Sequence, residues 1–542
     1  MAQQSPQVPA ADIAIIGAGT AGCLLAARLS ESGAHRVVLF EAGPEDSNRW
    51  INVPFGMQML MTNPAVNWLY ESEPVAGLGG RRLFEPRGKV VGGTGAINAS
   101  LYVRGNPADY DGWRDAGCPG WGYADVLPVF RKSECQQRGA DKYHGATGPM
   151  GVSDGPGDGL SRTFLEATQE LNLPQTDDFN GARQDGFGRF QTTTSKNIRQ
   201  STARNLLDPA RGRGNLEIIT GAQVTRVDFD GLRAVGVRYR VGGEERYLKV
   251  AREIVVAAGT FNSPQLLELS GIGDGAMLQS IGVPVLHHLP GVGANLQEHV
   301  GVKVIYRVAA ASLSLNRIGR NPLRKALAAA RYVAGRSGPL AWTNTFAGGF
   351  ARSHDDLPAP DIQITVNAWS ALGFSRDGLK PHSFPGVTFN AYHLTPQSRG
   401  SVHAGGPDPM ARPKITVAAL ETDYDRAAIR AGIRLVRRIL GTKAFTEAGV
   451  TEMEPGRPET SDAQLDAFAR DKMVAMLHPV GTCRMGSDDK AVVDPALRVR
   501  GVSGLRVVDA SVMPNITRGN TNAPTVMIAE KAATMILDDL RA

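Results

Sequence analysis

The sequence predicts an α/β protein in which a parallel nucleotide-binding sheet is joined to an α+β domain with an antiparallel sheet backed by helices. Short apolar strands at 12–16, 36–40, 254–257 and 505–510 alternate with glycine turns and helical segments, as in doubly wound sheets. From about 301 to 470 the pattern changes to strand-like segments of alternating polarity interleaved with amphipathic helices. These two patterns predict two different layers of structure.

The composition excludes several classes of function. The chain has 542 residues, of which 42% are hydrophobic, and a formal net charge of +6. Its basic residues form no contiguous Lys/Arg run, so nucleic-acid binding is not predicted. No stretch of 18 apolar residues occurs, so no transmembrane segment is expected. The four cysteines form no CxxC pair, and no metal site is predicted.

The N-terminus and the net charge bear on the location of the protein. The first twelve residues, MAQQSPQVPAAD, are polar and lack the apolar core of a secretory signal. Four thiols in so long a chain are typical of a reducing compartment. We therefore expect a cytoplasmic protein, and the positive charge leaves peripheral contact with the inner membrane open.

The first glycine motif stands in the context of a Rossmann-like fingerprint. GAGTAG (17–22) follows the strand 12–16 and leads into a predicted helix at 23–32. The next strand ends at Glu41, 19 residues after the last glycine of the motif. Such glycines let the backbone approach a pyrophosphate at the helix N-terminus, and the acidic residue binds ribose hydroxyls. The acid argues against NADP but does not separate NAD from FAD.

A second glycine cluster follows at 87–95, RGKVVGGTG. A structural loop is the simpler interpretation of this stretch alone. An extended dinucleotide such as FAD needs several backbone contacts, and this favours a second contact with the same ligand. The two glycine clusters together predict one long nucleotide site.

The middle of the chain adds further elements to the sheet. Residues 161–171 are predicted as an amphipathic helix, 173–200 as loop and 216–240 as an antiparallel meander. After the strand 254–257, Gly259 turns the chain and Ser263-Pro264 are predicted as the N-cap and first residue of a helix.

Two late segments carry the predicted chemistry, MVAMLHPVGTCRM (473–485) and PNITRGNTNAPT (514–525). His478 is the best general-base candidate because histidine titrates near neutral pH. Pro479 keeps the preceding backbone out of the α region, so His478 should be extended at an element boundary. Asn520 is its expected polar partner. The helix after Asn520 has an N-terminus with unpaired N–H groups and partial positive charge, suited to an anionic group.

The predicted antiparallel domain supplies candidate pocket residues. Asn367, Trp369, Phe389 and His393 are candidates to line a substrate pocket, although each is also an ordinary sheet residue. His299, in the turn GVGANLQEHV, is interpreted as a hydrogen-bonding residue rather than a catalyst.

Taken together, these stretches resemble the glucose–methanol–choline oxidoreductase family. The resemblance rests on GAGTAG with Glu41, RGKVVGGTGAIN, GTFNSPQLLELSGIG, HPVGTCRMG and DASVMPNITRGNTNAPTVMIAEKAA, in this order, and covers about residues 12–538. Within the family the chain looks most like the choline dehydrogenase-like and flavin alcohol dehydrogenase branch.

The resemblance implies a Rossmann-like FAD-binding domain and oxidation of a primary alcohol to an aldehyde, with hydride passing to flavin N5. His478 and Asn520 fall on the two catalytic positions. Some members attach the flavin covalently through a histidine, but Ile97 stands at that position here, so noncovalent FAD is expected. The predicted cofactor-binding residues are Gly17, Gly19, Thr20, Ala21, Gly22, Glu41, Ala42, Arg87, Val91, Gly92, Gly93, Thr94, Gly95, Asn98, Ala99, Val224, Ala258, Gly259, Asp509, Ala510, Asn520, Asn522 and Thr525.

The expected domain organisation is discontinuous. The FAD-binding domain takes residues 9–160, 205–300 and 473–542, a connector takes 161–204, and the substrate-binding domain takes 301–472. A small-molecule alcohol is the expected partner, and a dehydrogenase is favoured over an oxidase, with the electron acceptor, oxygen or a quinone, left open. The alternatives are an FAD-containing lyase of hydroxynitrile type, an NAD-dependent dehydrogenase and a flavin-bound binding protein.

Overall fold

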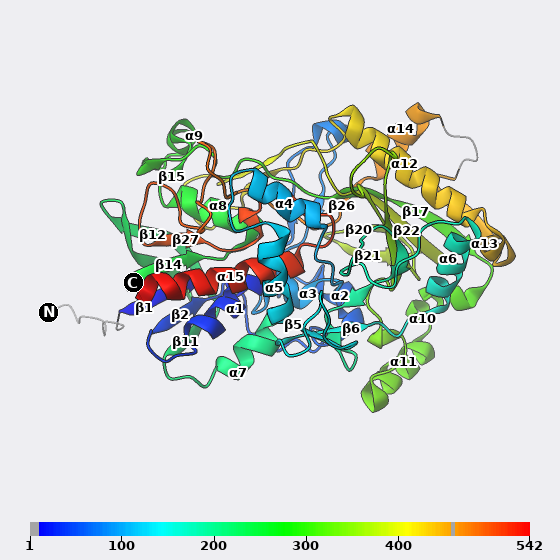
Figure 1. Cartoon of the computed structure of the whole chain (residues 1–542), viewed down its shortest axis with the longest axis horizontal. Coiled ribbons are helices and arrows are strands. Elements are labelled where there is room, and N and C mark those ends of the chain that lie inside the picture. Colours follow the sequence, from blue (N-terminus) through cyan, green and yellow to red (C-terminus); the bar gives the residue numbers. More distant parts are fainter. Residues whose placement is uncertain (1–9, 457–460, 542) are drawn as a thin grey trace.

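A seven-stranded sheet organises one half of the molecule (Figure 1). The computed structural model describes residues 10–456 and 461–541. The strands of this first sheet are β1 (Ala11–Ile16), β2 (Val37–Phe40), β11 (Leu216–Ile219), β12 (Ala222–Asp230), β13 (Arg233–Val241), β14 (Glu244–Val256) and β27 (Leu505–Val507). Their order is β11–β2–β1–β14–β13–β12, and β27 also pairs with β14.

The long strand β14 joins two kinds of pairing. Its last residues run parallel to β1 and β27, whereas its first part pairs antiparallel with β13. The predicted meander is therefore formed by β12, β13 and β14. The expectation that residues 216–219 belong to it is wrong, because β11 pairs parallel with β2.

Two helices with small side chains pack together on the first sheet. Helix α1 (Thr20–Leu29) begins three residues before the predicted start, directly after Gly19, and contacts the C-terminal helix α15 (Asn522–Arg541). Buried alanines on both helices allow this close approach, and α5 (Tyr123–Ser133) lies against α15. The C-terminal segment thus returns to the N-terminal motif.

Helix α8 (Gly259–Leu269) starts four residues before the predicted N-cap. Ser263 does not cap it, because its hydroxyl accepts from the Ala258 N–H and donates to Asp509. Pro264 lies inside the helix and has no N–H for the carbonyl of Thr260. That carbonyl accepts from the hydroxyl of Thr482, so the helix is joined to the segment that carries His478.

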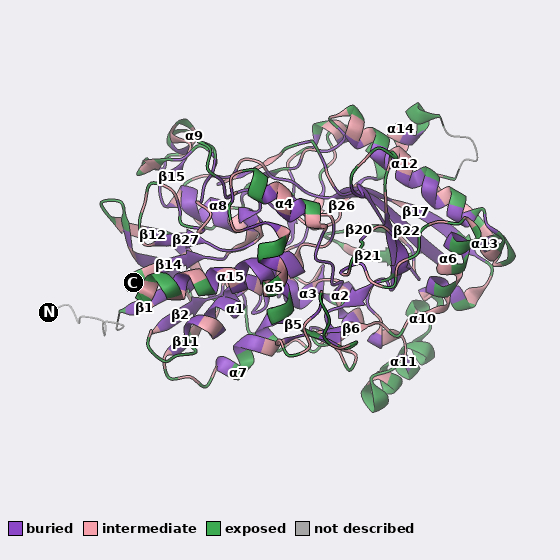
Figure 2. Cartoon of the chain, viewed as in Figure 1, coloured by how far each residue is buried: buried purple, intermediate pink, exposed green. Residues whose placement is uncertain are grey.

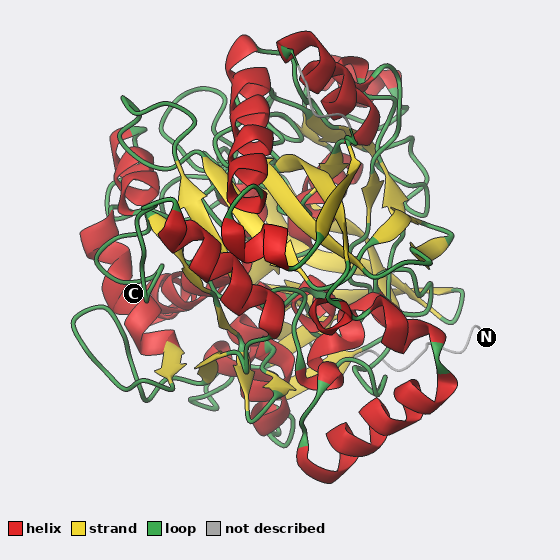
Figure 3. Ribbon diagram, turned by 90° about the vertical axis from the view of Figure 1, so that its right-hand side faces the viewer, coloured by secondary structure: helices red, strands yellow, loops and turns green. Residues whose placement is uncertain are grey.

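The second half of the molecule is built on an antiparallel sheet of seven strands. They are β7 (Gly186–Arg189), β17 (Val300–Val308), β18 (Ala347–Ala351), β19 (Ile362–Asn367), β22 (Gly386–His393), β25 (Val450–Glu454) and β26 (Val474–Ala475). Helices α6 (Gly159–Glu170), α12 (Asp423–Leu440), α13 (Lys443–Glu447) and α14 (Asp462–Lys472) cover one face, and Figure 3 looks onto this end. The predicted antiparallel sheet backed by helices is confirmed.

The stretch expected to be a connector contributes to the second sheet. Residues 173–200 were predicted as loop, but β7 within them pairs with β18, and α6 packs against β18 and β19. Phe164 and Phe187 lie buried in the same core cluster. The apolar periodicity of β7 is hidden in the sequence because two of its four residues are glycines.

Smaller elements complete the fold. They are η1 (Pro54–Gly56), α2 (Met57–Leu60), β3 (Tyr70–Glu71), η2 (Ala76–Leu78), β4 (Phe84–Glu85), α3 (Gly93–Ile97), α4 (Pro107–Asp115), β5 (Glu134–Gln136), β6 (Met150–Asp154), β8 (Gln191–Thr192), β9 (Thr194–Ser195), β10 (Ile198–Arg199), η3 (Ala203–Leu207), α7 (Asp208–Ala210), β15 (Ile272–Gly273), α9 (Gly275–Ser280), β16 (His287–His288), η4 (Ala311–Leu313), α10 (Asn316–Arg320), α11 (Pro322–Gly335), η5 (Pro339–Ala341), β20 (Ala371–Ser375), β21 (Gly378–Pro381), β23 (Ser401–His403), β24 (Lys414–Thr416) and η6 (Ala510–Val512).

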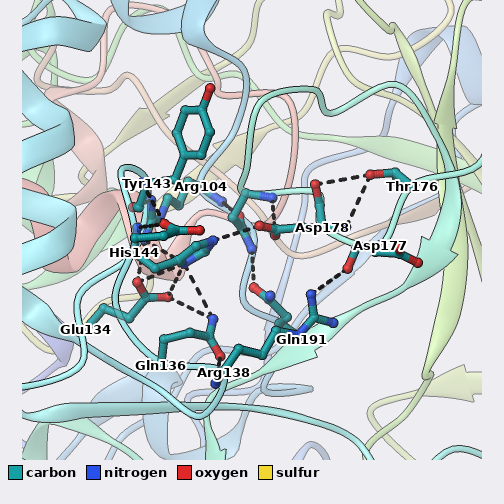
Figure 4. Close-up of polar contacts among 12 residues, drawn as sticks. Arg104, Glu134, Gln136, Arg138, Tyr143, His144, Thr176, Asp177, Asp178 and Gln191 are labelled. Atoms are coloured by element: carbon teal, nitrogen blue, oxygen red, sulfur yellow. Dashed lines mark hydrogen bonds and ion pairs between the residues drawn. The ribbon is translucent and has the colours of Figure 1, made fainter.

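A buried ionic cluster fastens the segments between the two sheets (Figure 4). The His144 ring lies 3.0 Å from a Glu134 oxygen and 2.7 Å from an Asp178 oxygen. Arg104 pairs with Glu134 at 2.6 Å. Burial alone would lower the pKa of His144, but its hydrogen bonds to Asp178 and Glu134 raise that pKa to about 9. His144 is therefore a cation at neutral pH, shared by two carboxylates.

Candidate active site

One cavity of about 520 Å³ extends from the first glycine motif to the second sheet. Twenty-three of the sequence-predicted residues line it: Gly17, Gly19, Thr20, Ala21, Glu41, Ala42, Arg87, Gly93, Thr94, Gly95, Asn98, Ala99, Val224, Ala258, Gly259, Asn367, Trp369, His478, Asp509, Ala510, Asn520, Asn522 and Thr525. Gly22, Val91 and Gly92 do not line it. The fold therefore brings together residues from both glycine clusters, both late segments and the second sheet.

Gly22 and Gly17 are needed because other parts of the backbone pack closely against them. A Cβ on Gly22 would lie 1.8 Å from the carbonyl oxygen of Gly17, so only glycine lets α1 pack on β1. Gly17 has a φ of +102°, and a Cβ there would lie 2.6 Å from the oxygen of Ala257. Gly19 differs, because nothing in the described chain lies within 4 Å of its Cβ position. The open side of the motif faces the cavity.

Val91 and Gly92 are packed away from the cavity. Val91 is fully buried, and its N–H donates to the carbonyl of Pro44. Gly92 donates its N–H to the carbonyl of Ala18, which ties the second glycine cluster to the first. Neither residue lines the cavity, and Gly92 joins the two turns; their predicted contact with a cofactor stays a prediction.

Glu41 shapes the same end of the cavity. Its buried carboxylate accepts from the Ala18 N–H at 3.0 Å and the Gly43 N–H at 2.8 Å. Burial raises the pKa of Glu41 to about 7, against the opposing effect of these hydrogen bonds and of Lys89. The carboxylate thus joins the turn after β1 to the turn after β2 and lines the cavity with its remaining surface.

Two helix N-termini meet at the cavity wall. The Thr20 hydroxyl donates to Asn522 Oδ1 at 2.8 Å and so joins the first residue of α1 to the first residue of α15. Neither helix has an acidic residue in its first turn, and the N-cap of α1 makes no side-chain hydrogen bond. Helix N-termini carry unpaired N–H groups and partial positive charge, so this wall suits an anion.

The backbone before His478 is held in an uncommon conformation. Leu477 has a φ of +70°, in the left-handed region that side chains other than glycine disfavour. The carbonyl of Leu477 accepts from Arg87 Nη1 at 3.0 Å, and the His478 N–H donates to Glu298 Oε1 at 2.6 Å. These contacts hold the backbone of His478 in the segment that follows β26.

Three side chains form a hydrogen-bonded row across the cavity wall. His299 Nε2 lies 3.0 Å from the carbonyl oxygen of Leu394, which only accepts, so Nε2 carries the proton and Nδ1 of a neutral His299 is an acceptor. His478 Nδ1, 3.1 Å from His299 Nδ1, must then be the donor. His478 Nε2 is left with its lone pair, 2.8 Å from Asn520 Nδ2. The row assigns His478 the tautomer of a base that faces the cavity.

The electrostatics keep this row neutral. Burial lowers the pKa of His478 to about 3, and the positive charge of Arg87 contributes in the same direction. Burial lowers the pKa of His299 well below its usual value, and the charge that a protonated His478 would carry acts in the same direction. Glu298 accepts from the His478 N–H. Burial and the charge of Glu85 raise the pKa of Glu298 well above its ordinary range. Arg87 lies 3.1 Å from Glu85 and 3.9 Å from Glu298, so its single charge balances one ionised carboxylate.

The turn at 291–300 joins the two late segments. Asn295 Nδ2 donates to the carbonyls of Gly481 and Pro514, and Gln297 both donates to Pro514 and accepts from the Ile516 N–H. His478 and Asn520, which are 42 residues apart, are therefore held at a fixed spacing. The sequence analysis singles out only His299 in this turn and does not predict this role for Asn295 and Gln297.

The second sheet supplies the far wall of the cavity. Because side chains alternate across a strand, Thr388, Asn390 and Tyr392 of β22 line the cavity, whereas Phe389 and His393 do not. Phe389 packs in the core beneath the helices and His393 lies near Asp425, so their suggested place in the pocket is wrong.

Trp369 and Asn367 lie on this wall as predicted from the sequence. Trp369 Nε1 donates to Asn344 Oδ1 at 3.2 Å, and Gln58 Nε2 donates to the same oxygen. Asn367 Oδ1 is buried and has no hydrogen-bond partner within residues 10–456 and 461–541. Among residues that the sequence did not single out, Gln58, Asn344 and Asn390 also line the cavity. Their place at the cavity follows from contacts between segments that are distant in sequence, so the sequence alone does not show it.

A cradle for a dinucleotide that faces a neutral histidine base defines a nucleotide-cofactor oxidoreductase. The family model for GMC oxidoreductases matches residues 11–301 with its N-terminal part and 396–529 with its C-terminal part. The chain belongs to the GMC oxidoreductase family, which uses FAD to oxidise alcohols.

Curated relatives and solved structures agree with this assignment. The chain is 41% identical to human mitochondrial choline dehydrogenase over 96% of this chain and 89% of the relative. It is 39% identical to "Alcohol dehydrogenase [acceptor]" of Pseudomonas putida, over 97% and 95% of the two chains. The crystal structure of pyridoxine 4-oxidase from Mesorbium loti superposes with a TM-score of 0.87 at 31% identity, covering 97% and 99%. These relatives favour alcohol oxidation over the lyase alternative.

The cavity fits FAD on its own geometry. The open side of Gly19, the uncapped N-terminus of α1 and the buried carboxylate of Glu41 suit the pyrophosphate and ribose of a dinucleotide. Asn520 Oδ1 is buried without a hydrogen-bond partner among the described residues, next to the proposed base. Ile97 is fully buried and its hydrocarbon side chain cannot bond to a flavin, in keeping with noncovalent FAD.

Proposed function

We propose that this protein oxidises an uncharged primary alcohol to the aldehyde, with His478 as the general base and Asn520 as its partner. The observation that carries the proposal is the row Leu394–His299–His478–Asn520, which leaves the Nε2 lone pair of His478 at the cavity. An alcohol oxygen entering there would replace His478 Nε2 as the acceptor of the Asn520 Nδ2 hydrogen bond and would donate its own proton to His478 Nε2.

The cofactor and the residues of the chain have different roles in the proposed reaction. Bound FAD would supply the acceptor for the carbon-bound hydrogen. We propose that Gly19, Glu41, Thr20 and Asn522 hold its phosphates and ribose, and that the backbone of residues 93–99 holds the ring system. His478 takes the hydroxyl proton, and Asn520 with His299 fixes its orientation. A base in this position typically contributes about 10²–10⁴-fold to the rate.

The far wall argues against a quaternary ammonium substrate. Within the described chain, the acidic residues that line the cavity are Glu41, Glu71 and Asp509, none of them on β17, β19 or β22. Lys303 of β17 lines this wall, and burial lowers its pKa to about 8. On this wall an ammonium would depend on the faces of Trp369 and Tyr392. The orphan oxygen of Asn367 instead suits a hydrogen-bond donor at the far end of the substrate.

The test is the absorbance of the flavin-loaded protein as alcohols are added without oxygen. Uncharged primary alcohols, including one with a second hydroxyl or an amine-type N–H, should bleach the flavin band faster than choline. Faster bleaching by choline would contradict the substrate proposal, and no bleaching by any alcohol would contradict the proposed activity. Admission of oxygen, or of a quinone, then identifies the acceptor.

A further inference from the structure

Helix α11 carries its apolar stripe on the side that faces solvent. Leu323, Leu327, Ala330 and Ala334 follow one another at i, i+4, i+7 and i+11, the spacing of one helical face. Leu323 is 79% exposed and Leu327 54% exposed, and Val333 beside them is 84% exposed. In a helix of a globular protein this stripe normally turns toward the core.

The opposite side of α11 makes the contact with the body of the protein. Ala328 is buried, and the Tyr332 hydroxyl donates to the carbonyl of Asn197 at 3.0 Å. Figure 1 shows α11 projecting from the molecule, and Figure 2 shows it exposed along almost its whole length. The orientation of the helix is therefore fixed by its polar tyrosine and a small alanine, with the leucines directed outward.

Cations surround this stripe without any neighbouring acid in the sequence. Six basic residues occur between 317 and 336: Arg317, Arg320, Arg324, Lys325, Arg331 and Arg336. All six are exposed, and within the described chain none forms an ion pair with a carboxylate. No Asp or Glu occurs from residue 299 to residue 354. The sequence does not show this as a Lys/Arg run, because helical turns bring the cations together.

Two elements that line the cavity also expose apolar side chains. Helix α2 lines the cavity with Met57 and Gln58 and exposes Met59, and strand β20 lines it with Ala371 and exposes Leu372. The segment before α11 is bonded to the β20–β21 hairpin region through Asn316 and the His382 carbonyl. Helix α11 is thus linked, through the segment before it, to a hairpin that exposes an apolar side chain beside the cavity.

We propose that α11 docks this protein on the surface of a membrane that contains anionic lipid. Amphipathic helices that lie in a membrane interface combine an apolar face with flanking Lys and Arg, whose long stems reach the headgroups. Juxtaposed cations are attracted to anionic headgroups. Docking differs from spanning: in the described chain no helix is long and apolar enough to cross a membrane.

Charge decides against a second copy of this chain as the occupant. A twofold interface centred on α11 would place each cationic patch against the same patch of its partner. The 299–354 segment offers no carboxylate to neutralise either. An anionic lipid surface satisfies both the cations and the leucines.

The experiment is flotation of the flavin-loaded protein with vesicles of phosphatidylcholine alone or mixed with phosphatidylglycerol. We expect binding to the anionic vesicles, weakened by salt, and little binding to phosphatidylcholine. The double variants Leu323→Asp/Leu327→Asp and Arg324→Glu/Lys325→Glu should each reduce the bound fraction at least about tenfold. Their flavin absorbance and their alcohol oxidation with a soluble dye should be unchanged.

Matched controls lie on the β12–β13–β14 meander, remote from α11. Leu232 is 47% exposed and Lys249 is exposed, so Leu232→Asp and Lys249→Glu make the same chemical changes elsewhere and should bind as the wild type does. Wild-type protein that binds neither vesicle type would overturn the proposal. So would α11 variants that still bind, or variants that lose only a dimer seen by light scattering, which would identify a second copy as the occupant.

Discussion

The two halves of the cavity are built by different means. On the first sheet, backbone groups of close turns form the wall. Glycine is required at 17 and 22 because a Cβ there would lie 2.6 and 1.8 Å from backbone oxygens. On the second sheet, side chains of three antiparallel strands form the wall, and their positions follow from strand register. The cofactor side of the cavity thus depends on local backbone geometry, whereas the opposite wall depends on the pairing of strands that are distant in sequence.

The largest effect should come from the backbone side. Gly22→Ala places a methyl group against the Gly17 carbonyl, which cannot move without shifting β1. We expect a loss of about 3 kcal/mol of stability, the upper range for overpacking, and loss of bound flavin. Thermal unfolding and flavin absorbance check this.

Gly19→Ala is the matched variant. Its Cβ would meet no protein atom within 4 Å, so the melting temperature should stay the same while FAD binding weakens. Equal melting temperatures for the two variants would refute the distinction between packing and ligand-facing glycines.

Glu41→Gln tests the buried acidic side chain beside the first glycine motif. The carboxylate accepts two backbone N–H groups, and a charge-assisted hydrogen bond is typically worth about 1.5–3 kcal/mol. We expect FAD affinity to fall about tenfold to a hundredfold in a titration of apoprotein with FAD. Glu45→Gln, at a partly exposed carboxylate that pairs with Arg211, should bind FAD normally, and equal affinities for both variants would argue against the role of Glu41.

Asn367→Ala tests the side-chain wall. We expect KM to rise about tenfold for alcohols with a distal hydrogen-bond donor, since one buried hydrogen bond is worth about 1–2 kcal/mol. Short alcohols without that donor should keep their KM and kcat. An equal rise for both kinds of alcohol would show that the residue supports the sheet and does not select the substrate.

His144→Gln should have the smallest effect on activity, because His144 does not line the cavity, and an effect on stability that depends on pH. Folding raises the pKa of His144 from 6.5 to about 9, so the imidazolium stabilises the fold fully below about pH 6.5. That contribution is lost as pH rises through about 9. The melting temperatures of wild type and variant should therefore differ most at pH 6 and converge above pH 9. A difference that grows with pH would contradict the assigned charge.

The sequence predicts the cofactor side well because its signals are local. GAGTAG, its flanking strands and Glu41 lie within 31 residues, and each was placed correctly to within three residues. Ser263 misled because Ser-Pro resembles a helix start, whereas Thr482, over two hundred residues away, accommodates the proline inside the helix. Strand β7 was missed for the same reason: its partner β18 lies far along the chain.

The proposed pair of His478 and Asn520 follows from His478-Pro479 and the resemblance, but the tautomer of His478 does not. That assignment needs Leu394, His299 and His478 at measured distances, from three separate segments. Glu298 and Arg87 influence His478 through burial and charge, which no spacing in the sequence reports.

The most direct measurement is the rate of anaerobic flavin bleaching in His478→Ala against wild type, at saturating alcohol and equal flavin content. The geometry predicts that the variant retains FAD and bleaches about 10²–10⁴-fold more slowly. His299→Gln, which can still donate to Leu394 and accept from His478, should lose far less. Bleaching by His478→Ala at the wild-type rate would contradict the assignment of His478 as the base.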